Sequence, residues 1–271
     1  MSVRTVALVT GSSSGIGRAI ALQLATLGYD LILHGRTDSS QLRNSVEQVA
    51  KRGSHVETLT GDFLEFQESD FTAFVLSANS LAGGRLKAWV NNAGADVLTG
   101  AAATESFAAK LDSIWKVDVQ ATLLLSRSIA EHWCESSIDA AIVNIGWDQA
   151  TTGLPGNSGQ MFAASKGAIM AMTSSLAQTY APWVRVNCLA PGWIQTAWGQ
   201  QADPQWSKLV ESQCLKGRWG TPEDVAEAAA FMLSPASRFI NGQVLHINGG
   251  LRTTSPEMEQ RLGLPNDRKG L

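Results

Sequence analysis

The stretch Val6-Ala7-Leu8-Val9-Thr10-Gly11-Ser12-Ser13-Ser14-Gly15-Ile16-Gly17 decides the fold of this 271-residue chain. Its first four residues are a short apolar run, typical of a strand buried on both faces of a parallel sheet. From Ile16 to Thr26 apolar residues recur at helical spacing, and Gly28 ends the pattern. A glycine loop between such a strand and helix lets a pyrophosphate approach backbone N–H groups and the positive end of the helix dipole. The spacing is GxxxGxG rather than the commoner GxGxxG, so a plain Gly/Ser-rich turn is the alternative interpretation.

The alternation of strand and helix patterns continues outward from this stretch. We expect further strands at 31–33, 56–59, 88–90, 141–145, 184–189 and 243–247, and further helices at 40–51, 104–134, 161–179 and 222–233. Such alternation predicts an α/β fold, with a parallel sheet covered by helices on both faces. No linker or repeat interrupts it. We therefore predict a single doubly wound Rossmann domain over residues 1–250, followed by a polar tail over 251–271.

Composition excludes several classes of protein. The net charge of −3 lacks the basic excess of a nucleic-acid binder, and no apolar run approaches the 18 or more residues of a membrane span. The N-terminus has no secretory signal pattern, so we expect a cytoplasmic protein. Neither the cysteines nor the histidines have metal-ligand spacing, so we predict no metal site. These residues are Cys134, Cys188, Cys214, His34, His55, His132 and His246.

Five segments, in order, resemble motifs of the short-chain dehydrogenase/reductase family, in particular its oxoacyl-ACP-reductase-like members. They are the loop at 10–17, Asn91-Asn92-Ala93-Gly94, the segment 191–196 (Pro-Gly-Trp-Ile-Gln-Thr), the segment 218–226 and the segment 242–250. The resemblance implies a Rossmann fold, a nicotinamide cofactor, a small-molecule substrate, a flap at 193–219 over the nicotinamide, and a homodimer or homotetramer. The implied cofactor-binding residues are Gly11, Ser12, Ser13, Ser14, Gly15, Ile16, Gly17, Arg36, Thr37, Asp62, Phe63, Asn91, Asn92, Ala93, Gly94, Lys166, Pro191, Gly192, Ile194 and Thr196.

The end of the second predicted strand indicates which nicotinamide cofactor is bound. Where NAD sites usually place an acidic residue, the chain has Gly35, and Arg36 follows. A guanidinium suits a 2′-phosphate, and this Gly-Arg pattern accompanies NADP(H) in the resembling family. We therefore predict that NADPH is preferred over NADH. The alternative is that Arg36 is an ordinary exposed loop residue, and Ser14 stands where many NADP members carry a second basic residue. Asp62 and Phe63 match the family's adenine-contacting pair.

The catalytic positions implied by the resemblance are mostly substituted. The family uses an Asn, a Ser, a Tyr and a Lys, and its Tyr and Lys lie four residues apart on one helix face. Here Lys166 is present, but Phe162 occupies the tyrosine position, Trp147 the serine position and Asp118 the asparagine position. Phenylalanine has no exchangeable proton and an indole N–H only donates, so these two side chains cannot run the usual proton relay.

The two tyrosines of the chain do not restore that relay. Tyr29 ends the first predicted helix, and Tyr180 lies fourteen residues beyond Lys166. We therefore predict Asp118 and Lys166 as the catalytic pair, a carboxylate and an ammonium that could hold a proton-delivering water. This resembles the dienoyl-CoA reductases of the same family.

Other interpretations of these residues stay open. The protein could be an oxoacyl-ACP-type reductase with weak or redirected activity, or a module that binds NADP(H) without turnover. Asp118 could be a structural helix carboxylate. Further polar candidates lie in the altered 147–162 loop, namely Asp148, Gln149, Asn157 and Ser158. Aromatic residues at and near the flap suggest a dry pocket for a flat or acyl substrate, although indoles also pack cores and interfaces. They are Trp147, Phe162, Trp183, Trp193, Trp198, Trp206 and Trp219.

Overall fold

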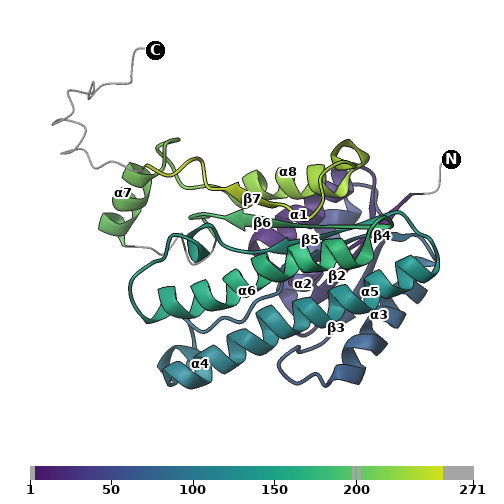
Figure 1. Ribbon diagram of the computed structural model, residues 1–271, viewed down its shortest axis with the longest axis horizontal. Helices are drawn as coiled ribbons and strands as arrows, with labels where there is room; N and C mark the ends of the chain where they lie inside the picture. Colours follow the sequence, from purple (N-terminus) through teal and green to yellow (C-terminus); the bar gives the residue numbers. More distant parts are fainter. Residues whose placement is uncertain (1–3, 197–198, 200–202, 253–271) are drawn as a thin grey trace, which may run out of the picture.

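The computed structural model describes residues 4–196, 199 and 203–252. Its described strands form one seven-stranded parallel sheet in the order β3-β2-β1-β4-β5-β6-β7 (Figure 1). The strands are β1 (Val6–Val9), β2 (Asp30–Gly35), β3 (Val56–Thr60), β4 (Leu86–Asn91), β5 (Ala140–Ile145), β6 (Val184–Pro191) and β7 (Val244–Ile247). The strand order reverses between β1 and β4, and ligands of open α/β sheets bind at the carboxyl ends of strands beside such a reversal. The predicted doubly wound Rossmann fold is confirmed.

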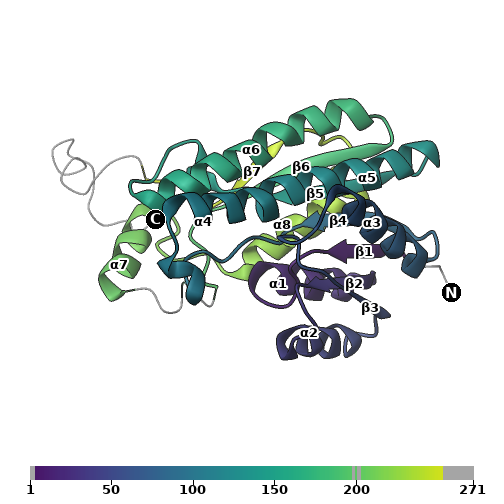
Figure 2. The same ribbon diagram turned by 90° about the horizontal axis from the view of Figure 1, so that it is seen from below.

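Helices cover both faces of the sheet (Figure 2). On one face α1 (Gly15–Thr26), α2 (Ser40–Ala50) and α8 (Pro222–Leu233) pack against a core that includes Val9 and Val143. On the other, α3 (Glu68–Ala82), α5 (Ala121–Glu135) and α6 (Asn157–Tyr180) pack against a core that includes Trp89 and Ile142. Because strand residues alternate between these two cores, both faces of each central strand are apolar, as the continuous apolar runs predict.

The structure differs from the sequence prediction in four helices. α3 and α7 (Pro204–Gln213) were not predicted, although Phe71, Phe74, Val75 and Ala78 follow helical spacing in α3. The helix predicted at 104–134 is instead a short 3₁₀ turn (Ala101–Thr104), α4 (Phe107–Ile114), a π-helical segment (Trp115–Gln120) and α5. α6 begins at Asn157, four residues before its predicted start, and it ends at Tyr180.

Membrane-spanning helices and clusters of metal ligands are both absent from the part of the chain that the structure describes. Within residues 4–196, 199 and 203–252, no helix combines the length and apolar character needed to cross a membrane. The same residues contain no group of three or more His, Cys, Asp or Glu side chains that could hold a metal ion.

Candidate active site

Glycines let the phosphate loop between β1 and α1 pack tightly against itself and against the segment that follows β4. Gly11 has φ +61°, and a Cβ placed on it would lie 2.8 Å from the Cα of Ala93. A Cβ on Gly17 would collide with the carbonyl oxygen of Gly11. Ser14 is the N-cap of α1, and its side chain makes no capping hydrogen bond to the described residues. The first-turn N–H groups of α1 are therefore available to an anion.

The segment after β4 holds this loop from behind. Asn92 donates through Nδ2 to the carbonyl oxygens of Thr10 and Gly11, at 3.0 and 3.1 Å. The Thr10 hydroxyl oxygen accepts from the N–H groups of Asn92 and Ala93, at 2.9 and 3.0 Å. Asn91 lies deeper and donates to Asn144 Oδ1 and Ser126 Oγ, each at 2.8 Å. Asn92 and Ala93 thus hold the phosphate loop in place, and Asn91 ties the end of β4 to β5 and α5.

The adenosine end of the candidate site carries one exposed arginine. The Arg36 side chain is 77% exposed, and its Nε lies 4.0 Å from Asp62 Oδ2. Thr37 beside it is also exposed. Arg18 points back toward the phosphate loop, where its guanidinium donates to the Ser13 carbonyl and, at 2.9 Å, to Ser45 Oγ. The Arg36 guanidinium is therefore exposed after β2, whereas that of Arg18 is engaged by the phosphate loop and α2.

Of the two residues predicted to contact the adenine, Asp62 is partly exposed, whereas Phe63 belongs to the core. The Phe63 ring is buried and stacks parallel to His34, with the ring centroids 4.4 Å apart. His34 has no role among the residues predicted from the sequence. Its position at the end of an apolar strand, directly before the glycine and arginine that mark the cofactor preference, is the signal that could have drawn attention to it.

The predicted catalytic pair is in direct contact. Asp118 lies in the π-helical segment and Lys166 lies in α6, and the distance from Asp118 Oδ2 to Lys166 Nζ is 2.8 Å. The Asp118 side chain is 2% exposed and that of Lys166 is 14% exposed. Asp118 Oδ1 accepts from the N–H of Ala95 at 2.8 Å, and Lys166 Nζ also donates to the Ile145 carbonyl at 3.3 Å. The direct contact leaves no place for a water between the two charged groups, so any bound water lies beside the pair.

The neighbouring positions are aromatic. Phe162 lies one turn before Lys166 in α6, and Trp147 follows β5. The two half-buried rings pack edge to face with their centroids 6.4 Å apart. Tyr180 lies at the far end of α6, where its hydroxyl donates to Glu131 Oε1 at 3.2 Å. Burial and the Glu131 carboxylate raise the pKa of Tyr180 to about 12. Tyr180 is therefore engaged with α5 at the end of α6 that is remote from Lys166.

Thr196, near the start of the predicted flap, lies against the phosphate loop. A Cβ placed on Gly15 would lie 3.6 Å from Thr196 Cγ2. The neighbouring Trp193 packs edge to face against Trp206 and Trp219, with centroid distances of 5.2 and 6.0 Å. These indoles form one cluster. Flap residues 197–198 and 200–202, with Trp198, and tail residues 253–271 lie outside the described residues.

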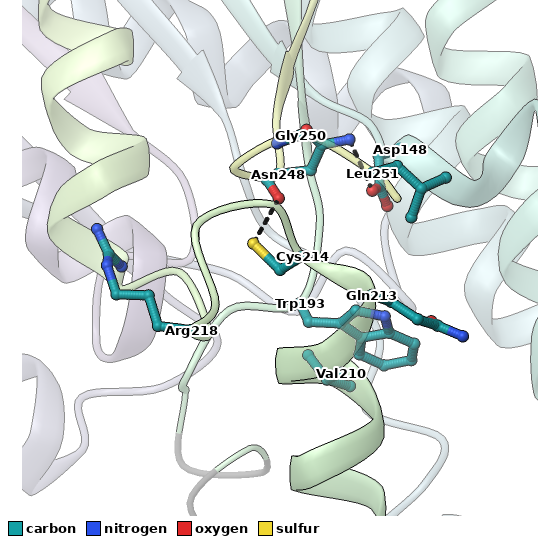
Figure 3. A pocket seen from close by; sticks show the side chains of 9 residues that line it. All are labelled: Asp148, Trp193, Val210, Gln213, Cys214, Arg218, Asn248, Gly250 and Leu251. Carbon is teal, nitrogen blue, oxygen red and sulfur yellow. Dashed lines mark hydrogen bonds between the residues drawn. The ribbon is translucent and has the colours of Figure 1, made fainter. Parts of the chain in front are cut away.

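A small cavity of about 20 Å³, room for about one water, lies between α7 and the ends of β5, β6 and β7 (Figure 3). Asp148 lines it, and its Oδ2 accepts from Asn248 Nδ2 at 3.2 Å. Its Oδ1 has no hydrogen-bond partner in the part of the chain that the structure describes. Burial raises the pKa of this carboxyl group. Of the other loop candidates, Gln149 is buried and Asn157 is exposed at the start of α6.

The chain is similar to many proteins of one family. The model of the enoyl-(acyl carrier protein) reductase family matches residues 11–252. Tropinone reductase-like 3 of Erythroxylum coca is 32% identical over 248 residues, which are 90% of this chain and 92% of the relative. The 3-oxoacyl-(acyl-carrier-protein) reductase of Aquifex aeolicus is 32% identical over 254 residues, covering 91% of this chain and 96% of the relative.

Solved structures agree with the sequence comparisons. A 3-oxoacyl-(acyl-carrier-protein) reductase of Agrobacterium tumefaciens C58 with NADP bound is 29% identical, with a TM-score of 0.79, over 91% of this chain and 93% of that chain. A short-chain dehydrogenase/reductase of Serratia marcescens is 27% identical, with a TM-score of 0.80, over 91% and 97%. The chain belongs to the short-chain dehydrogenase/reductase family of oxidoreductases.

Proposed function

We propose that this chain is an NADP(H)-dependent oxidoreductase that reduces a carbonyl or an enoyl or acyl-thioester substrate, with a proton donor other than tyrosine. One observation carries the proposal. The buried ion pair of Lys166 and Asp118, 2.8 Å apart, lies where the family's lysine and asparagine positions meet, beside two aromatic rings at the tyrosine and serine positions.

The residues around the phosphate loop fit a dinucleotide. The uncapped N-terminus of α1, which follows the glycine turn, suits the pyrophosphate. The exposed Arg36 suits a 2′-phosphate, which supports the preference for NADPH over NADH. When bound, the nicotinamide group would supply the hydride. We propose that the cofactor-binding residues implied by the family motifs hold it, with Lys166 among them.

The proton chemistry follows from the donors of Lys166. Lys166 Nζ forms the ion pair with Asp118 Oδ2 on one side and donates to the Ile145 carbonyl, whereas an ammonium carries three N–H groups. The third has no partner among the described residues and is available to a substrate oxygen or to a water beside it. Reduction of a conjugated C=C bond places negative charge on the substrate carbonyl oxygen, which an ammonium stabilises without giving up its proton. Asp118 fixes the ammonium and offsets its charge.

A second candidate function is favoured by the substitutions themselves. With Phe162 and Trp147 at the family's hydroxyl positions, the chain could bind NADP(H) without turnover. Purified protein incubated with NADPH and a panel of oxoacyl, enoyl and dienoyl thioesters separates the two functions. NADPH oxidation with at least one thioester is the expected result. NADPH binding with no oxidation across the panel would refute the reductase and leave the binding module.

A pair of variants tests the role of the ion pair in that assay. Asp118→Asn should lower turnover by about 100-fold, the scale of one proton-transfer or charge-stabilising group, with little change in NADPH affinity. Asp112→Asn is the matched control, because Asp112 lies in α4 in an exposed pair with Lys116 at 3.4 Å. Equal turnover in both variants would remove Asp118 from the mechanism.

We further propose a homodimer or homotetramer, as in the family, which the mass of the particle in solution would test.

A further inference from the structure

His34 joins two loops of the candidate cofactor site from inside the fold. It is the second-last residue of β2 and is 3% exposed. The N–H of Gly11, in the phosphate loop, donates to its Nδ1 at 3.2 Å. Its Nε2 lies 3.0 Å from the carbonyl oxygen of Gly61, the residue before Asp62. One imidazole therefore spans the loop after β1 and the loop after β3.

The hydrogen bonds fix the protonation state of this ring. A backbone N–H can only donate, so Nδ1 must present its lone pair to Gly11. The ring proton is then on Nε2, which donates to the Gly61 carbonyl oxygen. A protonated imidazolium has no acceptor and would lose the bond from Gly11. Burial lowers the pKa of His34 to about 4, against the opposing effects of the hydrogen bond to the Gly61 carbonyl and of the nearby Asp62 carboxylate. The ring is neutral near neutral pH.

The surroundings hold the ring in this position. Phe63 stacks on it with an interplanar angle of 8°, and Phe74 meets it edge to face at 5.3 Å. The Ser12 hydroxyl accepts from the backbone N–H of His34 at 2.9 Å and donates to its carbonyl oxygen at 3.2 Å. The phosphate loop is thus tied to β2 by Ser12 and to the imidazole by Gly11.

We infer that His34 is a positioning residue for the cofactor, whose neutral imidazole holds the phosphate loop against the loop that precedes Asp62. The inference rests on the proposed binding of NADP(H) at these loops. It assigns the Gly11 bond a specific role, because that bond sets where the Gly11 backbone stands relative to the pyrophosphate. A residue that merely filled the space beneath the loops would have no such dependence on one nitrogen atom.

Replacing His34 by Asn or by Gln distinguishes a positioning role of the Nδ1 atom from simple filling of the space beneath the loops. In His34→Asn the amide oxygen can stand near the position of Nδ1 and accept from Gly11, but the side chain is too short to reach Gly61. In His34→Gln the amide nitrogen can reach Gly61, but no acceptor remains near Gly11. The inference predicts that His34→Asn binds NADP⁺ within about threefold of the wild type, whereas His34→Gln binds about tenfold more weakly, the effect of one lost hydrogen bond. If only filled volume matters, the larger Gln binds as well as Asn or better.

Hydrogen exchange of the Gly11 amide in the ligand-free protein gives a second readout. Protection should persist in His34→Asn and fall about tenfold in His34→Gln. If the wild type binds neither NADP⁺ nor NAD⁺, the proposed function fails, and the Gly11 exchange rates alone decide whether His34 fixes the loop. Equal exchange in both variants overturns the inference.

The pH profile of the wild type keeps the inference testable if a variant does not fold. Exchange at Gly11, corrected for intrinsic chemistry, should speed up as the pH falls toward 4, because His34 then becomes protonated and stops accepting. A flat corrected profile from pH 7 to pH 4 in folded wild-type protein contradicts the inference.

Discussion

Replacing Asp118 by Asn should destabilise the fold by about 3–5 kcal/mol, because it leaves a buried ammonium without its counter-charge. At 2.8 Å and an effective dielectric constant of about 20, the attraction between Asp118 and Lys166 is roughly 6 kcal/mol before desolvation is subtracted. The Asn oxygen can still accept from the Ala95 N–H, so that hydrogen bond is kept. Lys166 retains only the Ile145 carbonyl among its described partners.

Urea unfolding followed by tryptophan fluorescence measures this loss as a change in the free energy of unfolding. The control Asp112→Asn breaks an exposed pair and should cost about 1 kcal/mol or less. The double variant Asp118→Asn, Lys166→Met removes both charges and should recover most of the loss. The reasoning is refuted if Asp118→Asn costs no more than Asp112→Asn. It is also refuted if the double variant loses as much stability as the single variants Asp118→Asn and Lys166→Met lose when their separate costs are added.

Three further predictions concern the cofactor end and the aromatic positions. Lowering the pH from 6.5 to 4 should remove about 3 kcal/mol of stability through His34, whose pKa of about 4 lies below that of the unfolded chain, so that the unfolded state binds the proton first. Urea unfolding at several pH values checks this, and His34→Asn should flatten the slope. Arg36→Ser should weaken NADPH binding about tenfold or more and leave NADH binding unchanged, and a fluorescence titration in which both cofactors weaken equally would contradict it. Phe162→Tyr combined with Trp147→Ser should give the chain measurable ketone reductase activity with NADPH, whereas its absence in a folded variant would show that the altered 147–162 loop displaces the substrate.

The sheet could be predicted because its information is local. Each central strand is a continuous apolar run, and each such run is followed by turn residues and a helical pattern. The glycine loop at 10–17 then fixes which end of the sheet carries the site. The helix predicted at 104–134 is in fact divided into several segments. The sequence could not show this division, because the π-helical segment Trp115–Gln120 keeps helical backbone angles and leaves the apolar pattern intact. α7 was missed because its one buried hydrophobic residue, Val210, gives no periodic pattern.

The candidate site was less predictable because its contacts join distant segments. Family resemblance placed Asp118 and Lys166 in one site, but only the packing of the π-helical segment against α6 shows that the two side chains are in direct contact. His34 is a stronger example. Its importance depends on the 3.2 Å approach of Gly11 and the 3.0 Å approach of Gly61, which belong to two other loops. No spacing along β2 contains that information.

The substitutions at the catalytic positions are consistent with one another as a set. The rings of Trp147 and Phe162 pack against each other, and Phe162 lies one turn before Lys166, so apolar surface stands where the family resemblance implies two hydroxyl groups. A buried ammonium with neutral partners alone becomes costly under those conditions. The Asp118 carboxylate offsets that cost, since its Oδ2 lies 2.8 Å from Lys166 Nζ and its Oδ1 accepts a hydrogen bond from the Ala95 N–H. At the positions where the family resemblance implies a phenol, a hydroxyl and an amide, the proposed site thus has an ion pair in an aromatic setting. This is the reason to look for its activity among reactions that need charge stabilisation at an oxygen more than proton donation from one.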